Sequence, residues 1–181
     1  MKILFLSDIH GIPKNLDYIK NLDKKENFDK IVVLGDLYYT GPSYNLDMII
    51  DSKKVLEFLN SYKHKLIAVR GNCDSDVDIK ASDFMFSNEL CLLSIDGVNI
   101  YCTHGNKYNK DNYSKLNKNS ILIYGHEHYP YIKKTEDFIF INVGSISLPR
   151  NNSNPSYGIY ENKSITLYDI NGLIIDYIEV K

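Results

Sequence analysis

The stretch KILFLSDIHGIPKNLDYIKNLDKKENFDKIVVLGD, residues 2–36, carries the pattern that decides the fold. It opens with an apolar run from Lys2 to Ser7 that is typical of a buried strand. Residues 13–25 follow, with a proline suited to the first turn of a helix and apolar side chains at helical spacing: Leu16, Ile19 and Leu22. A second buried strand is predicted at residues 30–34. This order implies two parallel strands with a helix outside the sheet.

The same alternation continues through the first half of the chain. Residues 45–62 predict a second amphipathic helix, with apolar side chains at Leu46, Ile49, Ile50, Val55, Leu56 and Leu59. Residues 66–69 predict a third buried strand. We therefore expect the first three strands to lie parallel in one sheet, with both helices outside it.

The second half of the chain is rich in strands. Residues 89–105 predict a hairpin around Asp96-Gly97, a dipeptide that favours two-residue turns. Further strands are predicted at residues 121–124, 131–134 and 138–142. The tail carries strands interrupted at residues 161–163 and at Asn171-Gly172. The whole pattern predicts an α/β fold of two packed sheets flanked by helices.

The length of 181 residues predicts one domain, residues 1–181, with a core of its own. The 21 Lys and Arg residues nearly balance the 23 Asp and Glu residues. This balance argues against a polyanion such as nucleic acid as a bulk partner. The Lys-rich stretch at residues 106–119 is interleaved with Asn and Asp, and we predict a solvated loop or helix face there.

The apolar runs and the cysteines bear on the compartment. Runs such as Ile3–Leu6 are far shorter than the ~20 residues that span a bilayer. The N-terminus lacks the hydrophobic region and cleavage site of a signal peptide. The three cysteines, Cys73, Cys91 and Cys102, are odd in number and lack CxxC spacing, which favours a reducing compartment. We therefore expect a cytoplasmic protein that does not bind membranes.

Five predicted strands end in short turns that carry Asp, His or Asn beside glycine. The turns are Asp8-Ile9-His10-Gly11, Gly35-Asp36, Gly71-Asn72-Cys73-Asp74, Thr103-His104-Gly105 and Gly125-His126-Glu127-His128. Each turn alone is commonplace, as a cap, a turn-forming dipeptide or a loop histidine. In open α/β sheets, however, ligands bind beyond the carboxyl ends of the strands. Five such turns in one order therefore predict a shared site.

The side chains in these turns suit metal ions. Two Asp, one Asn and four His supply carboxylate, amide and imidazole ligands, which fit borderline divalent ions such as Mn, Fe or Zn better than Ca or Mg. Seven side chains exceed the needs of one ion with an open position. They suit two ions that share a bridging carboxylate and activate a water. His126 and His128, two residues apart, are then expected to point to different ions.

The motifs DIH, GD, GNCD, THG and GHEH, in this order, resemble those of the calcineurin-like metallophosphoesterase superfamily. Cys73 within GNCD stands where many members have His, and this is similar to the small YfcE-like phosphodiesterase branch of bacteria and archaea. The resemblance extends from Lys2 to about Pro149. It implies a four-layer α/β/β/α sandwich with a dinuclear metal centre at one end.

The resemblance also implies a role for each of seven ligand positions: Asp8, His10 and His128 bind the first metal, Asp36 bridges both, and Asn72, His104 and His126 bind the second. The expected ions are two Mn²⁺, with Fe, Zn, Ni or Co as alternatives. The implied reaction is hydrolysis of a phosphodiester by in-line attack of a hydroxide bound at this centre. Asp36, Asn72 and Cys73 are the candidate catalytic residues.

Several positions depart from the family pattern. Cys73 replaces a histidine that is a candidate general acid in the wider superfamily, and it could serve as proton donor, as a partner of a ligand or as filler. Asn106 replaces the second histidine of the THGH found in many relatives. Residues 142–145 read NVGS where relatives often read NPGS. Arg70 and Arg150, the two arginines, could contact a phosphate or lie on the surface.

Three alternatives remain open at this point. The same metal motifs suit a phosphomonoesterase or a cyclic-nucleotide phosphodiesterase. A non-catalytic interaction scaffold is also possible, because the retromer subunit has this fold. All seven ligand positions hold competent residues, which favours an enzyme. The expected partner is a small phosphoester, and the sequence leaves the physiological substrate, the native metal and a homo-oligomer open.

Overall fold

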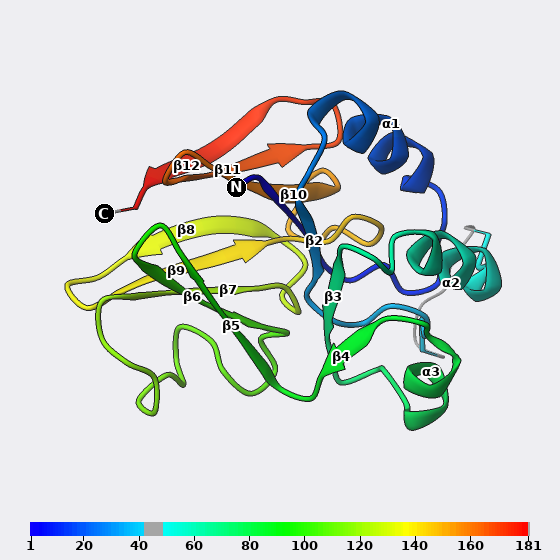
Figure 1. Cartoon of the computed structure of the whole chain (residues 1–181), viewed down its shortest axis with the longest axis horizontal. Helices are drawn as coiled ribbons and strands as arrows, with labels where there is room; N and C mark the ends of the chain where they lie inside the picture. The colour runs from blue at the N-terminus through cyan, green and yellow to red at the C-terminus, as the bar shows by residue number, and fades with distance from the viewer. Residues whose placement is uncertain (42–48, 181) are drawn as a thin grey trace.

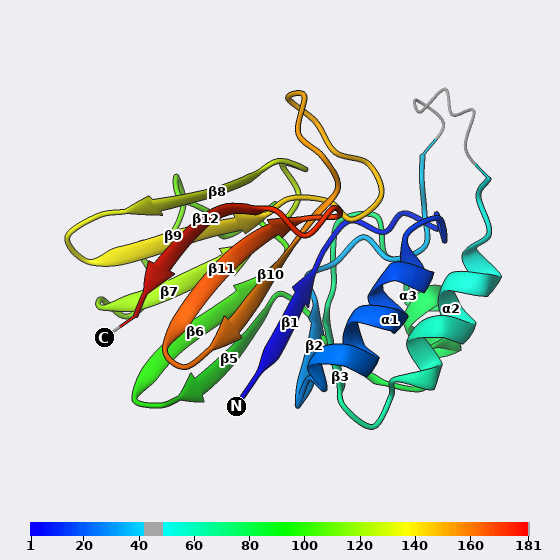
Figure 2. The same ribbon diagram turned by 90° about the horizontal axis from the view of Figure 1, so that it is seen from above.

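The computed structural model of the chain describes residues 1–41 and 49–180. Two β-sheets lie face to face, and the helices lie to one side of them (Figures 1 and 2). The seven-stranded sheet has the order β12-β11-β10-β1-β2-β3-β4. Its strands are β1 (Ile3–Leu6), β2 (Lys30–Val33), β3 (Leu66–Val69), β4 (Met85–Ser87), β10 (Ser156–Glu161), β11 (Ser164–Asp169) and β12 (Ile174–Glu179).

The five-stranded sheet has the order β5-β6-β7-β9-β8. Its strands are β5 (Leu90–Ile95), β6 (Val98–Thr103), β7 (Ser120–Tyr124), β8 (Pro130–Lys134) and β9 (Phe138–Val143). Both sheets are mixed. Strands β1 to β4 pair in parallel, as do β6, β7 and β9, and the remaining pairs are antiparallel. The predicted parallel pairing of the first three strands is confirmed.

Alternation along β1 explains the layers. Ile3 and Phe5 belong to the core between the two sheets, whereas Leu4 and Leu6 belong to the core under the helices. Successive strand residues point to opposite faces, so a fully apolar strand is buried on both sides. Helices α1 (Leu16–Glu26) and α2 (Ser52–Ser61) cover the outer face of the seven-stranded sheet.

The outer face of the five-stranded sheet is covered differently. Tyr108, Tyr113 and Leu116, from the Lys-rich stretch, pack against buried aromatic and aliphatic residues of β7 and β9. Residues 106–119, all of which the structure describes, form a loop and contain no helix. The two mixed sheets and their helices confirm the predicted fold class, and a loop supplies the layer on this far side.

Two predicted helix starts are wrong. Helix α1 begins at Leu16 rather than at Pro13, because the Leu16 N–H donates to the Pro13 carbonyl at 3.1 Å in a preceding turn. Helix α2 begins at Ser52 rather than at residue 45. Asp51 caps it by accepting a hydrogen bond from the Lys54 N–H at 2.9 Å. Ile49 and Ile50 precede this cap and are exposed, and the predicted Leu46 lies outside the described residues.

Two short elements were not predicted. Helix α3 (Asp76–Ala81) buries none of its side chains and is held at its start by a capping box between Ser75 and Asp78. Strand β4 has three residues and adds to the edge of the sheet beside β3. The predicted hairpin turn is confirmed, since Asp96 and Gly97 both have positive φ, 53° and 83°.

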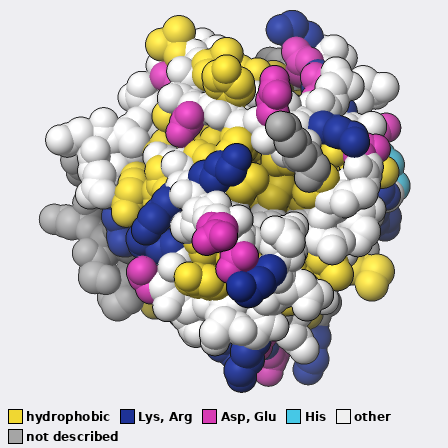
Figure 3. All heavy atoms as spheres, turned by 90° about the vertical axis from the view of Figure 1, so that its left-hand side faces the viewer, with side chains coloured by type: hydrophobic (Ala, Val, Ile, Leu, Met, Phe, Trp, Pro, Cys, Tyr) yellow, Lys and Arg dark blue, Asp and Glu magenta, His cyan; other side chains and the backbone are white. Residues whose placement is uncertain are grey.

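The end of the molecule opposite the helices carries the edges β8 and β12, which contact each other. Hydrophobic side chains on this side are interspersed with Lys, Arg, Asp and Glu (Figure 3). Within the described parts of the chain, no helix combines the length and apolar character needed to cross a membrane.

Candidate metal centre

The five polar turns meet where the two sheets adjoin. The Asp8 N–H donates to the Gly35 carbonyl at 3.1 Å, and this bond joins the turns after β1 and β2. The Gly125 N–H donates to the His104 carbonyl at 3.0 Å, and this bond joins the turns after β6 and β7. The His126 N–H then reaches across to Asp8 Oδ2 at 2.9 Å. The predicted convergence of the turns is therefore what the structure shows.

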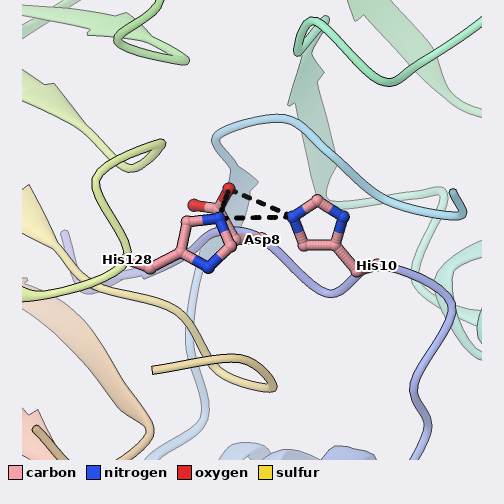
Figure 4. Close-up of side chains that lie close together, drawn as sticks. All are labelled: Asp8, His10 and His128. Atoms are coloured by element: carbon pink, nitrogen blue, oxygen red, sulfur yellow. Dashed lines mark hydrogen bonds and ion pairs between the residues drawn. The ribbon is translucent and has the colours of Figure 1, made fainter. Parts of the chain in front are cut away.

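The first group of side chains comprises Asp8, His10 and His128, which lie together in Figure 4. His128 Nε2 lies 3.1 Å from Asp8 Oδ1, and His10 Nε2 lies 3.6 Å from the same oxygen. The two Nε2 atoms are 3.4 Å apart. All three residues are buried, although they come from segments 118 residues apart in the chain.

The second group comprises Asp36, His104 and His126. His104 Nε2 lies 3.3 Å from Asp36 Oδ2 and 3.2 Å from His126 Nδ1. Asn72 joins this group, since its Oδ1 lies 3.1 Å from His104 Nε2. His126 and His128 thus lie in different groups, as their spacing predicted.

Asp36 lies between the two groups. Its Oδ2 is 3.7 Å from His10 Nε2 in addition to 3.3 Å from His104 Nε2. Its other oxygen, Oδ1, accepts a hydrogen bond from the Cys73 N–H at 2.8 Å. Cys73 Sγ forms a third close group with His10 and Asp36. One carboxylate therefore faces histidines of both groups while its second oxygen is fixed by the backbone.

Hydrogen bonds to backbone carbonyls decide which nitrogen of each ring faces the centre. Three histidines place Nδ1 against a carbonyl oxygen: His10 on Tyr39 at 2.6 Å, His104 on Leu34 at 2.7 Å and His128 on Leu148 at 2.7 Å. A carbonyl only accepts, so Nδ1 carries the proton, and Nε2 of a neutral ring presents a lone pair. Such outer partners are typical of metal-binding histidines.

Lone pairs therefore face carboxylates. The Nε2 atoms of His10, His104 and His128 lie 3.1–3.7 Å from carboxylate oxygens of Asp8 and Asp36. Asp8 Oδ1 is buried and accepts no hydrogen bond. Acceptors that converge in a buried place are costly unless protons or cations lie between them. Imidazole nitrogens, carboxylates and an amide oxygen form a donor set that fits divalent ions such as Mn, Fe or Zn.

Without metal, protons satisfy these acceptors. Burial alone raises the pKa of Asp8, but the nearby His10 and His128 rings lower it well below its ordinary value. Burial lowers the pKa of His104, but the Asp36 and Asp8 carboxylates raise it to about 9. A cation bound by these side chains would replace the protons, since metal ligands bind in their deprotonated forms.

The backbone of the site is held in an unusual conformation. Five of the candidate ligands have positive φ: Asp8 at 54°, His10 at 53°, Asp36 at 56°, His126 at 63° and His128 at 63°. Residues other than glycine seldom adopt these angles, and each costs roughly 1–3 kcal/mol unless its surroundings impose it. The hydrogen bonds between the turns impose it here, and such outliers concentrate at functional sites.

Two acidic residues beside the candidate ligands, Asp74 and Glu127, have structural roles that the sequence did not predict. Asp74 is buried and accepts hydrogen bonds at 2.8 Å from the backbone N–H groups of Asp36, Leu37 and Gly71. It therefore fastens the turn that carries Asp36 to the turn that carries Asn72. Its place in GNCD, beside a turn-forming Gly-Asn, was the available signal.

Glu127, between the two histidines of GHEH, accepts a bond from Lys110 Nζ at 2.8 Å. The Lys110 N–H also donates to the Tyr124 hydroxyl at 3.2 Å, and that hydroxyl lies 2.6 Å from Tyr131 Oη. Glu127 thus ties the histidine turn to the loop over the five-stranded sheet. Its contacts come from a distant part of the chain, so no local pattern could reveal them.

The residues that depart from the family pattern, and the two arginines, lie in different surroundings. Cys73 is half-buried, and burial together with the Asp36 carboxylate raises the pKa of its thiol to about 12. Arg70 binds the Asp74 carbonyl at 2.9 Å and Asp76 at 2.8 Å. Arg150 is exposed, and its N–H donates to the His128 carbonyl at 3.0 Å. Asn106 is exposed and lines a hollow beside Asn72.

Residues 142–145, at the end of β9 and just after it, form hydrogen bonds with the backbone of the turns that carry Asp8 and His126. Asn142 Nδ2 donates to the Gly125 carbonyl at 2.6 Å, and Ser145 Oγ donates to the Asp8 carbonyl at 2.7 Å. Both side chains are buried. The structure therefore places this loop under the ligand turns, where it fixes their backbone.

Gly125 packs so closely on Asp8 that a methyl group at this position is expected to damage the site. A Cβ there would lie within 3.0 Å of Ser7 Oγ and Asp8 Oδ2, so Gly125→Ala must displace the carboxylate. We expect a loss of roughly 1–3 kcal/mol in the free energy of unfolding and weaker metal binding. Thermal denaturation and calorimetric metal titration measure both. Gly158→Ala, whose Cβ would meet side-chain carbons at 3.2 Å or more, is the control, and wild-type metal affinity in Gly125→Ala contradicts the expectation.

Comparison with known proteins identifies the family. The model of the calcineurin-like phosphoesterase superfamily domain matches residues 1–164. Phosphodiesterase YfcE of Escherichia coli strain K12 is 34% identical over 171 residues, which cover 94% of this chain and 93% of the relative. A probable metallophosphoesterase of Mycoplasma genitalium, MG207, is 27% identical over 87% of this chain and 85% of the relative.

Solved structures agree. That of Yfce, a phosphoesterase from E. coli, matches with a TM-score of 0.94 and 32% identity, covering all of both chains. Vps29 of Entamoeba histolytica, complexed with Zn²⁺, matches over all of both chains with a TM-score of 0.68 at 19% identity, which shows a shared fold alone. The resemblance drawn from the motifs is thereby confirmed, including its YfcE-like branch. The chain belongs to the calcineurin-like phosphoesterase superfamily.

Proposed function

We propose that this chain is a metal-dependent phosphodiesterase that works with two divalent ions. The observation that carries the proposal is the position of Asp36 between two groups of possible metal ligands, one of which is buried and holds the unsatisfied oxygen of Asp8. Family membership and 34% identity to a phosphodiesterase support it. We also propose that residues 1–181 act as one domain.

The proposed ligands divide as the two groups do. Asp8, His10 and His128 would hold the first ion, Asn72, His104 and His126 the second, and Asp36 both. When bound, such a pair supplies an activated water and neutralises charge on the phosphoryl group. The chain's own part is to fix the ligands: Tyr39, Leu34 and Leu148 carbonyls orient the rings, and Asp74 holds the backbone of Asp36.

Mn²⁺ is the proposed ion, with Fe, Zn, Ni or Co as alternatives. Four imidazoles beside two carboxylates and one amide favour ions of borderline softness over Mg²⁺ or Ca²⁺. The proposed substrate is a small phosphodiester. Hydrolysis of monoesters or of cyclic nucleotides at this site is the alternative, and the cytoplasmic location stays a prediction.

One experiment tests both the activity and the substrate class. Purified protein is assayed for metal content and then, with Mn²⁺, for hydrolysis of bis(4-nitrophenyl) phosphate and 4-nitrophenyl phosphate. The proposal expects metal to co-purify or rebind, and a higher kcat/KM for the diester. A higher kcat/KM for the monoester would favour the alternative. Bound metal without hydrolysis of either ester would favour the scaffold.

The Cys73 thiol is expected to contribute little to departure of the leaving group. Cys73→Ser should leave hydrolysis of nitrophenyl diesters almost unchanged, because nitrophenolate leaves without a proton. Wild-type kcat/KM should fall steeply as the leaving group becomes more basic, since general-acid help worth ~10²–10⁴-fold is then missing. Both proteins are compared over a series of aryl and alkyl diesters. A flat series for wild type that turns steep in Cys73→Ser would show instead that the thiol is the acid.

A further inference from the structure

Two hollows in the surface border the dipeptide Asn72-Cys73: Asn72 lines one of them and Cys73 lines the other. The first, of about 400 Å³, is named here the polar hollow and is lined by Arg70, Asn72, Asn88, Glu89, Asn106 and Lys107 among others. The second, of about 440 Å³, is named the tyrosine hollow and is lined by Tyr38, Tyr39, Ser52, Cys73, Ser75 and Asp78. A group bound at the proposed centre would have one hollow on either side.

The dipeptide connects each hollow to the centre. Asn72 Oδ1 lies 3.1 Å from His104 Nε2, in the group that also contains His126. Cys73 Sγ lies in the group with His10 and Asp36. The polar hollow therefore opens beside the second group of ligands, and the tyrosine hollow opens beside the first.

Charges in the polar hollow are already paired. Lys107 Nζ forms an ion pair with Glu89, and Arg70 binds Asp76 at 2.8 Å and the Asp74 carbonyl at 2.9 Å. A second phosphate would therefore have to break existing ion pairs. The exposed amides of Asn88 and Asn106 offer both donors and acceptors, which suit the hydroxyl groups of a sugar or a polyol.

The tyrosine hollow has a different chemistry. Tyr39 is 52% exposed, while its carbonyl is fixed by His10 Nδ1 at 2.6 Å. Tyr38 is buried beside it and its hydroxyl is paired with Ser82 Oγ at 2.8 Å. Asp78 is occupied by the Ser75 cap. An exposed ring on an anchored backbone is a surface on which a flat aromatic group can stack.

A phosphodiester has two arms on one phosphorus, and the site has two unlike hollows on one centre. We propose that the enzyme is built for unsymmetrical phosphodiesters, with a flat aromatic arm on Tyr39 and a hydroxyl-bearing arm between Asn88 and Asn106. This inference rests on the proposed function and names its substrate class. Nucleoside–polyol diesters have both arms.

The test uses two substrates with one leaving group, glyceryl 4-nitrophenyl phosphate and methyl 4-nitrophenyl phosphate. In both, the water oxygen bonds to phosphorus while the bond to the aryl oxygen breaks. Nitrophenolate leaves with the electron pair, one proton passes to solvent, and the glyceryl or methyl phosphate monoester remains. Differences in leaving group are thus removed from the comparison.

Steady-state kinetics of the Mn²⁺-loaded full chain are expected to distinguish the contribution of the hydroxyl-bearing arm from that of the aromatic arm. Wild type should prefer the glyceryl substrate by roughly threefold to tenfold in kcat/KM, as one or two hydrogen bonds allow. The double variant Asn88→Ala/Asn106→Ala should lose this preference. Tyr39→Ala should raise KM for both substrates by roughly threefold to tenfold, and Tyr39→Phe should not. Asn117→Ala and Tyr177→Ala, exposed residues that line neither hollow, are the controls.

The contrary outcomes are distinct. Equal kcat/KM for both substrates in wild type, or a preference that survives the double Asn variant, overturns the place of the hydroxyl-bearing arm. Unchanged KM in Tyr39→Ala overturns the place of the aromatic arm. The proposed function itself fails only if metal-loaded wild type hydrolyses neither diester.

Discussion

Exhaustive chelation is expected to abolish hydrolysis of bis(4-nitrophenyl) phosphate. The seven proposed ligands include no thiolate, so divalent ions should leave reversibly and their activated water should leave with them. Mn²⁺ should restore the rate better than Mg²⁺, because four of the donors are imidazole nitrogens and Mg²⁺ prefers oxygen. The measurement is the initial rate before chelation, after it, and after each metal is added back.

The chelated protein serves as its own control if it stays folded, which circular dichroism reports. Metal content must be verified by elemental analysis at each stage. Full activity of a folded protein with no detectable metal would end the proposal of two ions.

Asp36→Asn is expected to lower kcat by roughly 10³-fold or more, because one side chain faces both groups of ligands. The amide keeps an oxygen that can accept the Cys73 N–H, so the turn should survive while the charge between the groups is lost. Both metal sites should weaken together. Metal stoichiometry and affinity, measured by titration, accompany the kinetics.

His128→Ala is the matched comparison for Asp36→Asn. His128 lies in the first group, so its loss should mainly weaken one of the two ions. A folded Asp36→Asn protein with near wild-type turnover would contradict the role proposed for Asp36. Equal loss of both ions in His128→Ala would contradict the division into two groups.

The sequence predicted those features that depend on local chemistry. Apolar runs ending in Asp, His or Asn located the five turns, because a strand buried on both faces must be apolar and its polar residues can begin only at its end. Parallel order then placed the turns at one end of the fold. The separation of His126 from His128 followed from their spacing, and the structure places them in different groups.

The features that the sequence did not predict depend on capping or on packing between segments that are apart in the chain. Ile49 and Ile50 continue the helical spacing of α2 but are exposed, and the Asp51 cap rather than the apolar pattern decides where the helix begins. Helix α3 has no buried face, so its sequence has no apolar period. Asp74 and Glu127 act through partners that only the folded chain brings near.

The loop layer over the five-stranded sheet has a consequence for how metal would be exchanged. Its backbone forms hydrogen bonds within the loop, between Asn109 and Asn112 and from the Leu116 N–H to the Tyr113 carbonyl, and the Asn119 N–H donates to the Asp137 carbonyl. Side chains such as Tyr113 also pack it against the sheet. A layer of this kind opens locally at a lower free energy than a central strand does.

The Lys110–Glu127 ion pair links that opening to the turn that carries His126 and His128. Opening of the loop would then loosen the turn that carries one proposed ligand of each group. Amide hydrogens of residues 106–119 would exchange with solvent on the timescale of metal loss, and those of β7 far more slowly.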